Sequence, residues 1–128
     1  MSNLEELKSR FLVSNSLSEA KMLSLLQIAV EHCAVDIQGN VEIKNDALSA
    51  KDKITLVLVA RFIAHQLDET ILSEVKVDEL ARNTSISGVQ VRARASDLAK
   101  ARQIEVVDRG VYRALLHRIE SFLQGLPH

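Results

Sequence analysis

The segment 50–67 constrains the fold of this chain most strongly, because apolar side chains surround a helix in this register on nearly every side. Its apolar residues form two stripes, with Ile54, Val57, Leu58 and Phe62 in one and Leu56, Val59, Ile63 and Leu67 in the other. A helix of this kind is buried by its neighbours on most sides. We therefore expect it at the centre of one fused domain, with the N-terminal helices on one side and the C-terminal half on the other.

Three helix-start signals divide the first half of the chain. In each, a serine precedes a carboxylate by three residues, so that the hydroxyl accepts from an unpaired backbone N–H and the acid bonds back to the cap. The pairs are Ser2 with Glu5, Ser16 with Glu19, and Ser49 with Asp52. They predict helices over about 3–11, 17–34 and 50–67.

Between the second and third of these helices, apolar residues alternate on both sides of Gly39-Asn40. This pair tolerates the positive φ of a tight hairpin turn. The pattern predicts a small β-hairpin whose buried face carries Val35, Ile37, Val41 and Ile43.

The second half of the chain alternates short helices with short strands. In order, the sequence predicts an extended stretch at 75–77, a short helix at 78–83, a turn at 84–88, a helix at 88–101, a hairpin at 104–115 that turns at 108–110, and a final helix at 117–126. Apolar spacing in the helix 88–101 turns Val91, Ala95 and Leu98 inward.

This order of elements resembles the winged helix-turn-helix family over about residues 50–116. The residues that carry the resemblance are Val77-Asp78-Glu79-Leu80-Ala81-Arg82, Ile86, Val91-x-x-x-Ala95-x-x-Leu98, Ile104-Glu105-Val106 and Arg109-Gly110-Val111-Tyr112. The resemblance implies a mainly α fold with small β-hairpins (α+β), in which 88–101 is the recognition helix and 104–115 the wing. Residues 1–49 are then an N-terminal extension packed on the central helix, and 117–128 a C-terminal helix and tail.

Arg102 departs from the family pattern, which often has glycine just past the recognition helix. Glycine takes a left-handed φ at little cost. Arg102 therefore either extends the helix or accepts backbone strain.

The formal net charge of the chain is −1, from 16 basic and 17 acidic residues, which excludes a protein that is basic throughout. The charge is nevertheless uneven. Residues 82–113 hold seven basic and three acidic side chains, whereas residues 1–81 hold eight basic and 13 acidic ones. The positive charge thus coincides with the predicted helix-turn-helix, where such a fold meets phosphate.

The resemblance and the charge together predict a set of DNA-binding residues on the recognition helix and the wing. They are Gln90 and Ser96 for base or backbone contacts, Arg92, Arg94, Lys100 and Arg102 as phosphate contacts around the helix, and Arg109 and Arg113 on the wing. Two alternatives stay open. The arginines could form surface ion pairs with acids such as Asp97 and Asp78, and residues 108–110 could make no more than a reverse turn.

The function that the sequence favours is a duplex-DNA-binding transcriptional regulator that binds mainly through phosphates. Aromatic residues are few, and single-strand binders need exposed rings for stacking. We expect Phe11, Phe62 and Phe122 in the core, and Tyr112 packing the wing onto the domain. The alternative is a winged-helix module that docks a protein partner within a larger assembly and binds no DNA, which exposed Val89 and Ala93 would favour.

A homodimer is a further prediction, because duplex-reading regulators usually present two recognition helices. The residues available to join two copies are Met22, Leu23, Leu25, Leu26 and Ile28 in the helix 17–34, and Leu116, Ile119, Phe122 and Leu123 in the last helix. Alternatively, both helices only cover the central helix.

No catalytic constellation emerges, so we expect neither an enzyme nor a cofactor or metal site. Cys33 is expected as a small core residue at the end of a helix, and His65 as a structural histidine on the central helix. His32 is next to Cys33 and points about 100° away on a helix, so the two cannot chelate together. No targeting signal and no apolar run long enough for a membrane span is recognisable, which predicts a cytoplasmic protein without membrane contact.

Overall fold

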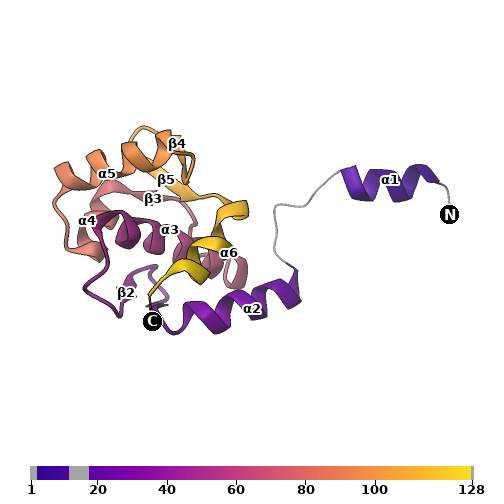
Figure 1. Ribbon diagram of the computed structural model, residues 1–128, viewed down its shortest axis with the longest axis horizontal. Helices are drawn as coiled ribbons and strands as arrows, with labels where there is room; N and C mark the ends of the chain where they lie inside the picture. The colour runs from indigo at the N-terminus through magenta and orange to yellow at the C-terminus, as the bar shows by residue number, and fades with distance from the viewer. Residues whose placement is uncertain (1–2, 12–17, 128) are drawn as a thin grey trace.

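A computed structural model describes residues 3–11 and 18–127 of the chain, and within these residues the fold is α+β, with six helices and two small antiparallel sheets (Figure 1). The helices are α1 (Asn3–Phe11), α2 (Glu19–Ala29), α3 (Ala50–Leu67), α4 (Val77–Thr84), α5 (Gly88–Lys100) and α6 (Leu116–Gly125). The strands are β1 (Cys33–Val35), β2 (Val41–Ile43), β3 (Val75–Lys76), β4 (Ile104–Asp108) and β5 (Val111–Ala114).

Helix α3 is the centre of the fold, as the sequence predicts. Every residue from Ile54 to Ala64 is buried, and α3 contacts α2, the β1–β2 hairpin, α4, α5 and β5. The Ser49 side chain caps the helix by accepting from the Asp52 backbone N–H at 3.1 Å. The apolar side chains around α3 therefore pack against other elements on every side of the helix.

The second helix is shorter than predicted, and the prediction of helix over 17–34 is wrong at its C-terminal end. Helix α2 ends at Ala29, and Cys33 begins strand β1 instead of ending a helix. Lys44 N–H donates to the His32 carbonyl at 2.9 Å, which continues the β1–β2 pairing and competes with further helix. At the start of α2, Ser18 supplies the cap by accepting from Lys21 N–H, whereas Ser16 lies outside the described residues.

The first hairpin forms where expected, but its turn differs. Gly39 alone takes a positive φ, of 87°, and the turn runs from Asp36 to Asn40, whose backbones are hydrogen-bonded. Val41 is buried and Val35 and Ile43 pack against the core. Ile37, predicted on the buried face, is 86% exposed because it lies in the loop, out of register with the strands.

A buried guanidinium, Arg61 of α3, connects the hairpin to the second half of the chain. It donates to the carbonyl oxygens of Gly39, Leu72 and Glu74 and pairs with the Glu79 carboxylate at 3.1 Å. The Arg61 side chain is 5% exposed. Burying it requires this full set of acceptors, because an unpaired buried charge is strongly destabilising.

The second half of the chain follows the predicted order of elements. Strands β3, β5 and β4 form one antiparallel sheet in which β5 is the central strand. Tyr112 of β5 pairs with Val75 of β3 on one side and with Val106 of β4 on the other. Helices α4 and α5 pack on each other and on α3. Tyr112 is 8% exposed and joins the core, as predicted for the packing of the wing.

Arg102 resolves the alternative that the sequence leaves open, because it takes a left-handed φ of 57° instead of extending α5. Arg102 N–H donates to the Ala99 carbonyl and Gln103 N–H donates to the Leu98 carbonyl, at 3.0 and 2.9 Å. These bonds are those of a Schellman motif, which usually has glycine at this position.

The two helices predicted to join a homodimer pack on each other in one chain instead. Met22 and Leu25 of α2 are buried, as are Ile119 and Leu123 of α6, and Lys21 pairs with Glu120 across the contact. Most of the proposed dimer residues therefore belong to the core of the single chain, which favours the alternative that these helices cover the fold, and the homodimer itself stays a prediction.

Helix α1 forms over the predicted residues, but the described side chains of α1 are exposed. Phe11, predicted in the core, is 86% exposed, and Figure 1 shows α1 apart from the rest of the fold. Phe62 is buried and Phe122 packs against the core, as predicted. Of the N-terminal extension, then, α2 and the hairpin pack on α3, and α1 does not. Ser2, the predicted cap of α1, lies outside the described residues.

Candidate nucleic-acid interface

Helix α5 presents one face to the core and the opposite face to solvent. Val91 and Ala95 are fully buried and Leu98 is 7% exposed, as the apolar spacing predicts. The Ser87 side chain caps the helix by accepting from Gln90 N–H at 3.3 Å. The outward face carries the exposed side chains of Val89, Gln90, Arg92, Ala93, Ser96 and Lys100.

The β4–β5 hairpin ends in a tight turn whose tip is Arg109-Gly110. Gly110 takes a positive φ of 70°, and the register of the β4–β5 pairing shifts between Val106 and Asp108, next to the turn. Gly110 carbonyl oxygen accepts from Val77 N–H at 3.1 Å. This bond fixes the tip against the start of α4, so that the exposed Arg109 side chain is carried by an anchored backbone.

An open cleft of about 510 Å³ lies where the hairpin tip, the start of α4 and α5 meet. Its lining residues are Lys76, Val77, Asp78, Arg92, Arg109, Gly110 and Val111. The Arg92 guanidinium is close to the tip, since a Cβ placed on Gly110 would lie 3.7 Å from its Nη1. Three cationic side chains and one carboxylate therefore line this cleft, which we call the basic cleft.

The basic cleft brings together only part of the predicted site. Arg92 and Arg109 line it, and neither guanidinium has a hydrogen bond or an ion pair within the part of the chain that the structure describes. Lys76, which the sequence reasoning missed, lines it as well. The sequence could have indicated Lys76 by its position between Val75 and Val77. Side chains alternate along a strand, so Lys76 faces away from these two buried residues.

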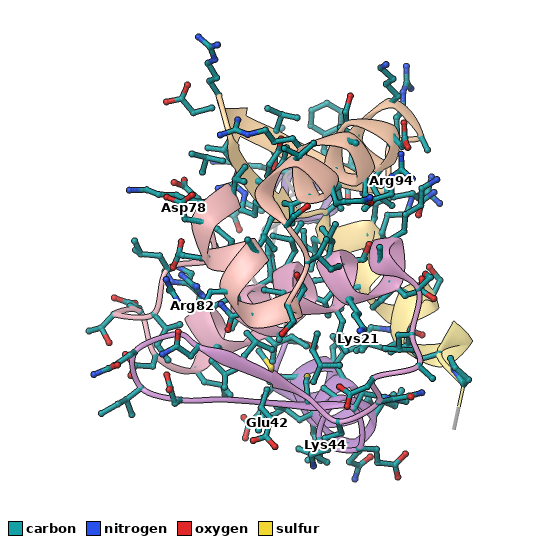
Figure 2. The ribbon with its side chains drawn as sticks, turned by 90° about the vertical axis from the view of Figure 1, so that its left-hand side faces the viewer. Lys21, Glu42, Lys44, Asp78, Arg82 and Arg94 are labelled. Carbon is teal, nitrogen blue, oxygen red and sulfur yellow. The ribbon has the colours of Figure 1, made fainter. Side chains whose placement is uncertain are left out.

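Two of the predicted arginines are paired with carboxylates. Arg94 pairs with Asp97 one turn later on α5, at 3.3 Å, which is the surface ion pair that the sequence left open. Figure 2 shows Asp78 and Arg94 on opposite sides of this view, so that Asp78 is not the partner. Arg113 pairs with Glu105 at 3.1 Å and with Glu74 at 3.7 Å.

Arg113 also lies on a different surface from the basic cleft. On β5 the buried Tyr112 and Ala114 face the core, and Arg113 between them faces the other side of the sheet. There it lines a separate polar cleft with His65 and His117. Its two carboxylate partners and this orientation argue against a role beside Arg92.

The remaining predicted residues lie on α5 or just past its end. Gln90 and Ser96 are exposed on the outward face of α5, while Lys100 and Arg102 are exposed at its C-terminal end. Neither of the two cations lines the basic cleft. They extend the positive surface of α5 toward the start of β4.

Cys33 and His65 have structural surroundings. Burial raises the pKa of the Cys33 thiol to about 11, and a smaller effect of nearby Lys44 lowers it. The thiol lies 3.5 Å from the Ala29 carbonyl oxygen, and Nδ1 of His65 lies 2.7 Å from the Ile71 carbonyl oxygen. Within residues 3–11 and 18–127, no three His, Cys, Asp or Glu side chains gather closely enough to hold a metal ion.

In the described part of the chain, no helix combines the length and the apolar character that crossing a bilayer requires. No protein-family model matches the chain, and neither the curated proteins nor the solved structures contain a significant match to it.

Proposed function

We propose that residues 50–116 are a winged helix-turn-helix and that the protein binds duplex DNA. The fold proposal is supported by the order α3, β3, α4, α5, β4, β5 and by the sheet order β3-β5-β4. In that arrangement α5 is the recognition helix and the β4–β5 hairpin is the wing. A recognition helix enters the major groove while flanking elements contact the backbone.

The observation that carries the DNA-binding proposal is the basic cleft. Lys76, Arg92 and Arg109 come from three different elements and converge there, with Asp78 as the carboxylate among the lining residues. Arg92 and Arg109 have no protein acceptor among the described residues, so that their donors can meet phosphate oxygens. A phosphate between the recognition helix and the wing would satisfy both guanidinium groups at once.

Binding of this kind is dominated by phosphates. Arg92 lies on the flank of α5 and Arg109 on the wing tip, whereas Gln90 and Ser96 are the polar side chains that face outward for contacts with bases. Affinity should therefore depend strongly on salt, because each neutralised phosphate releases counterions. As a small transcriptional regulator, the protein would use the basic cleft and α5 to bind duplex sites.

The test is a salt titration of binding to a random-sequence duplex, with a matched pair of variants. Arg109→Ala should weaken binding at every sequence and reduce the slope of log K against log salt by about one. Arg113→Ala removes the same charge from a paired arginine outside the basic cleft and should leave the slope unchanged. Absence of binding at low salt, or equal effects of the two variants, would contradict the proposal.

A second function, docking of a protein partner, is favoured by the outward face of α5. Val89 is 80% exposed and Ala93 next to it is exposed, while Arg94 is neutralised by Asp97. A module of this kind would lose its partner on Val89→Asp and would keep it on Arg109→Ala. Val89→Asp would also weaken DNA binding, because it adds a carboxylate to the outward face of α5, so Arg109→Ala is the variant that separates the two functions.

A further inference from the structure

Helix α1 carries an apolar face that the structure leaves without a partner. Leu4, Leu7 and Phe11 are 74%, 56% and 86% exposed and follow the spacing i, i+3, i+7, which places them on one side of the helix. Glu5 and Glu6 occupy the other sides, and Lys8 flanks the apolar face next to Leu4. An amphipathic helix of nine residues is marginal in water by itself, so its stability depends on an apolar surface that covers this face.

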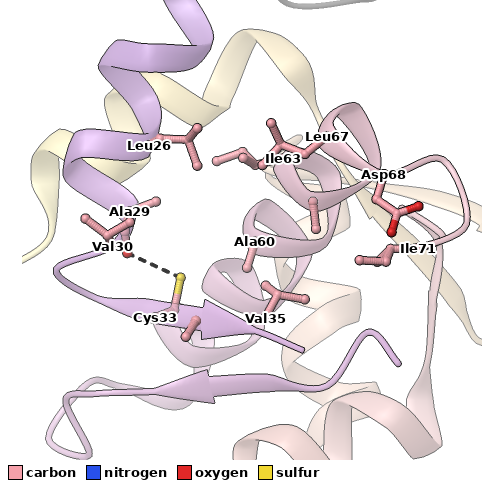
Figure 3. A pocket seen from close by; sticks show the side chains of 12 residues that line it. Leu26, Ala29, Val30, Cys33, Val35, Ala60, Ile63, Leu67, Asp68 and Ile71 are labelled. Carbon is pink, nitrogen blue, oxygen red and sulfur yellow. Dashed lines mark hydrogen bonds between the residues drawn. The ribbon is translucent and has the colours of Figure 1, made fainter. Parts of the chain in front are cut away.

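A matching apolar surface lies on the main fold, between α2 and the C-terminal part of α3 (Figure 3). It contains a groove of about 210 Å³ that is lined by Leu26, Ala29, Val30, Cys33, Ala34, Val35, Ala60, Ile63, Ala64, Leu67, Asp68 and Ile71. Val30 and Leu67 at its edge are 55% and 61% exposed. We call this surface the apolar groove.

The two surfaces have the same spacing. Along α2, the exposed Leu23 precedes Leu26 and Val30 of the apolar groove by three and seven residues, which repeats the pattern of Leu4, Leu7 and Phe11 in α1. Side chains at these spacings form one ridge on each helix. Two such ridges pack along one another when the helices lie side by side.

A charge at one end of the ridge on α2 favours one direction. Lys44 donates to the Val30 carbonyl oxygen at that end. Helix α1 has Glu5 and Glu6 in its first turn. With its N-terminus at Val30 and its ridge along that of α2, α1 would place these acids near Lys44.

We propose that α1 of one copy docks into the apolar groove of a second copy, and that the exchange is reciprocal. In the structure α1 lies apart from the rest of its own chain (Figure 1), which is the arrangement that an exchanged helix requires. Because the exchange is reciprocal, each copy contributes both its α1 and its groove, so that the contact forms twice in the dimer. The dimer does not depend on DNA binding, nor on the α2–α6 contact within the chain.

The experiment measures the mass of the full chain by light scattering across the micromolar range, without DNA. The wild type should approach twice the chain mass. Leu7→Glu in α1 and Val30→Glu in the groove should each weaken the dimer about 100-fold, because both symmetric contacts lose a buried side chain worth about tenfold in affinity. Ile37→Glu, at an 86% exposed position outside the groove, is the matched control and should leave the dimer intact.

Mixing the two variants tests the exchange itself. A heterodimer of L7E and V30E joins the intact α1 of V30E to the intact groove of L7E, so association should partly return. A monomeric wild type, a dimer that resists both variants, or a mixture that stays monomeric would each overturn the proposal. Both positions are more than half exposed, and circular dichroism checks that the variants fold; Phe11→Glu and Leu67→Glu are equivalent substitutes.

Discussion

The two β-hairpins of this protein have similar turns and opposite surroundings. Each turns at a glycine with positive φ, Gly39 at 87° and Gly110 at 70°. The Gly39 carbonyl oxygen accepts from the buried Arg61, whose guanidinium would lie 3.1 Å from a Cβ on that glycine. At the second turn the arginine is Arg109 itself, which is exposed beside the basic cleft.

The difference shows how one residue type serves two purposes. Arg61 is surrounded by three carbonyl oxygens and the Glu79 carboxylate, so its donors are used within the fold. Arg109 is held only through its backbone, which leaves its five donors for an acceptor outside the chain. The first hairpin is thus a structural element, and the second is the one suited to binding.

The largest expected effect is that of Arg61→Ala, which removes the buried cation from the first hairpin. It should lower the free energy of unfolding by about 3–5 kcal/mol, because the Glu79 carboxylate and three carbonyl groups lose their donor. Urea unfolding measures the change. Arg113→Ala, which breaks only partly exposed ion pairs, should cost about 1 kcal/mol. Equal losses of unfolding free energy for the two variants would contradict the structural role given to the buried Arg61.

The glycines of the two turns should respond unequally to alanine. Gly39→Ala should cost about 2–3 kcal/mol, because left-handed strain adds to the close contact with a guanidinium that its hydrogen bonds hold in place. Gly110→Ala should cost about 1 kcal/mol, since its nearest contacts are ordinary ones at 3.7 Å. Thermal unfolding of both variants makes the comparison. A larger loss of stability at Gly110 than at Gly39 would contradict the closer packing around the Gly39 turn.

The chain leading into the second hairpin offers a stabilising change. Arg102→Gly should raise the free energy of unfolding by about 0.5–1 kcal/mol, because glycine adopts the φ of 57° without the steric cost that arginine has there. Differential scanning calorimetry detects this as a higher Tm. Arg102→Ala is the control, because it removes the charge and keeps the strain; a gain of the same size would point to charge instead.

The smallest effect concerns how stability depends on pH through the Arg61–Glu79 ion pair, which connects the first hairpin to α4. Burial raises the pKa of Glu79, but hydrogen bonds from Lys76 N–H and Arg61 and the Arg61 charge outweigh it, so the pKa lies below its usual 4.5. The carboxylate therefore stabilises the fold above the unfolded pKa, and this contribution is lost as the pH falls through the folded pKa. Urea midpoints of the wild type and Glu79→Gln should converge as the pH falls below the unfolded pKa and through the folded one. A gap that widens on acidification would contradict this sign.

Local patterns in the sequence determined the helices and their inward faces. Apolar residues around the whole of 50–67 indicated the central, buried α3, and the spacing of Val91, Ala95 and Leu98 determined which side of α5 faces the core. These properties depend on residues within one or two turns of each other. The same holds for the turn at Gly110, where glycine permits the required φ.

Apart from local pairs such as Arg94 with Asp97, the partners of the charged side chains were decided by the tertiary structure. Arg92 and Arg94 are two residues apart on one helix, yet Arg92 lines the basic cleft and Arg94 pairs with Asp97. Arg61, which in the sequence only interrupts an apolar run, became the link between the first hairpin and α4. A long charged side chain takes its role from the acceptors within its reach, and folding brings these from distant parts of the chain.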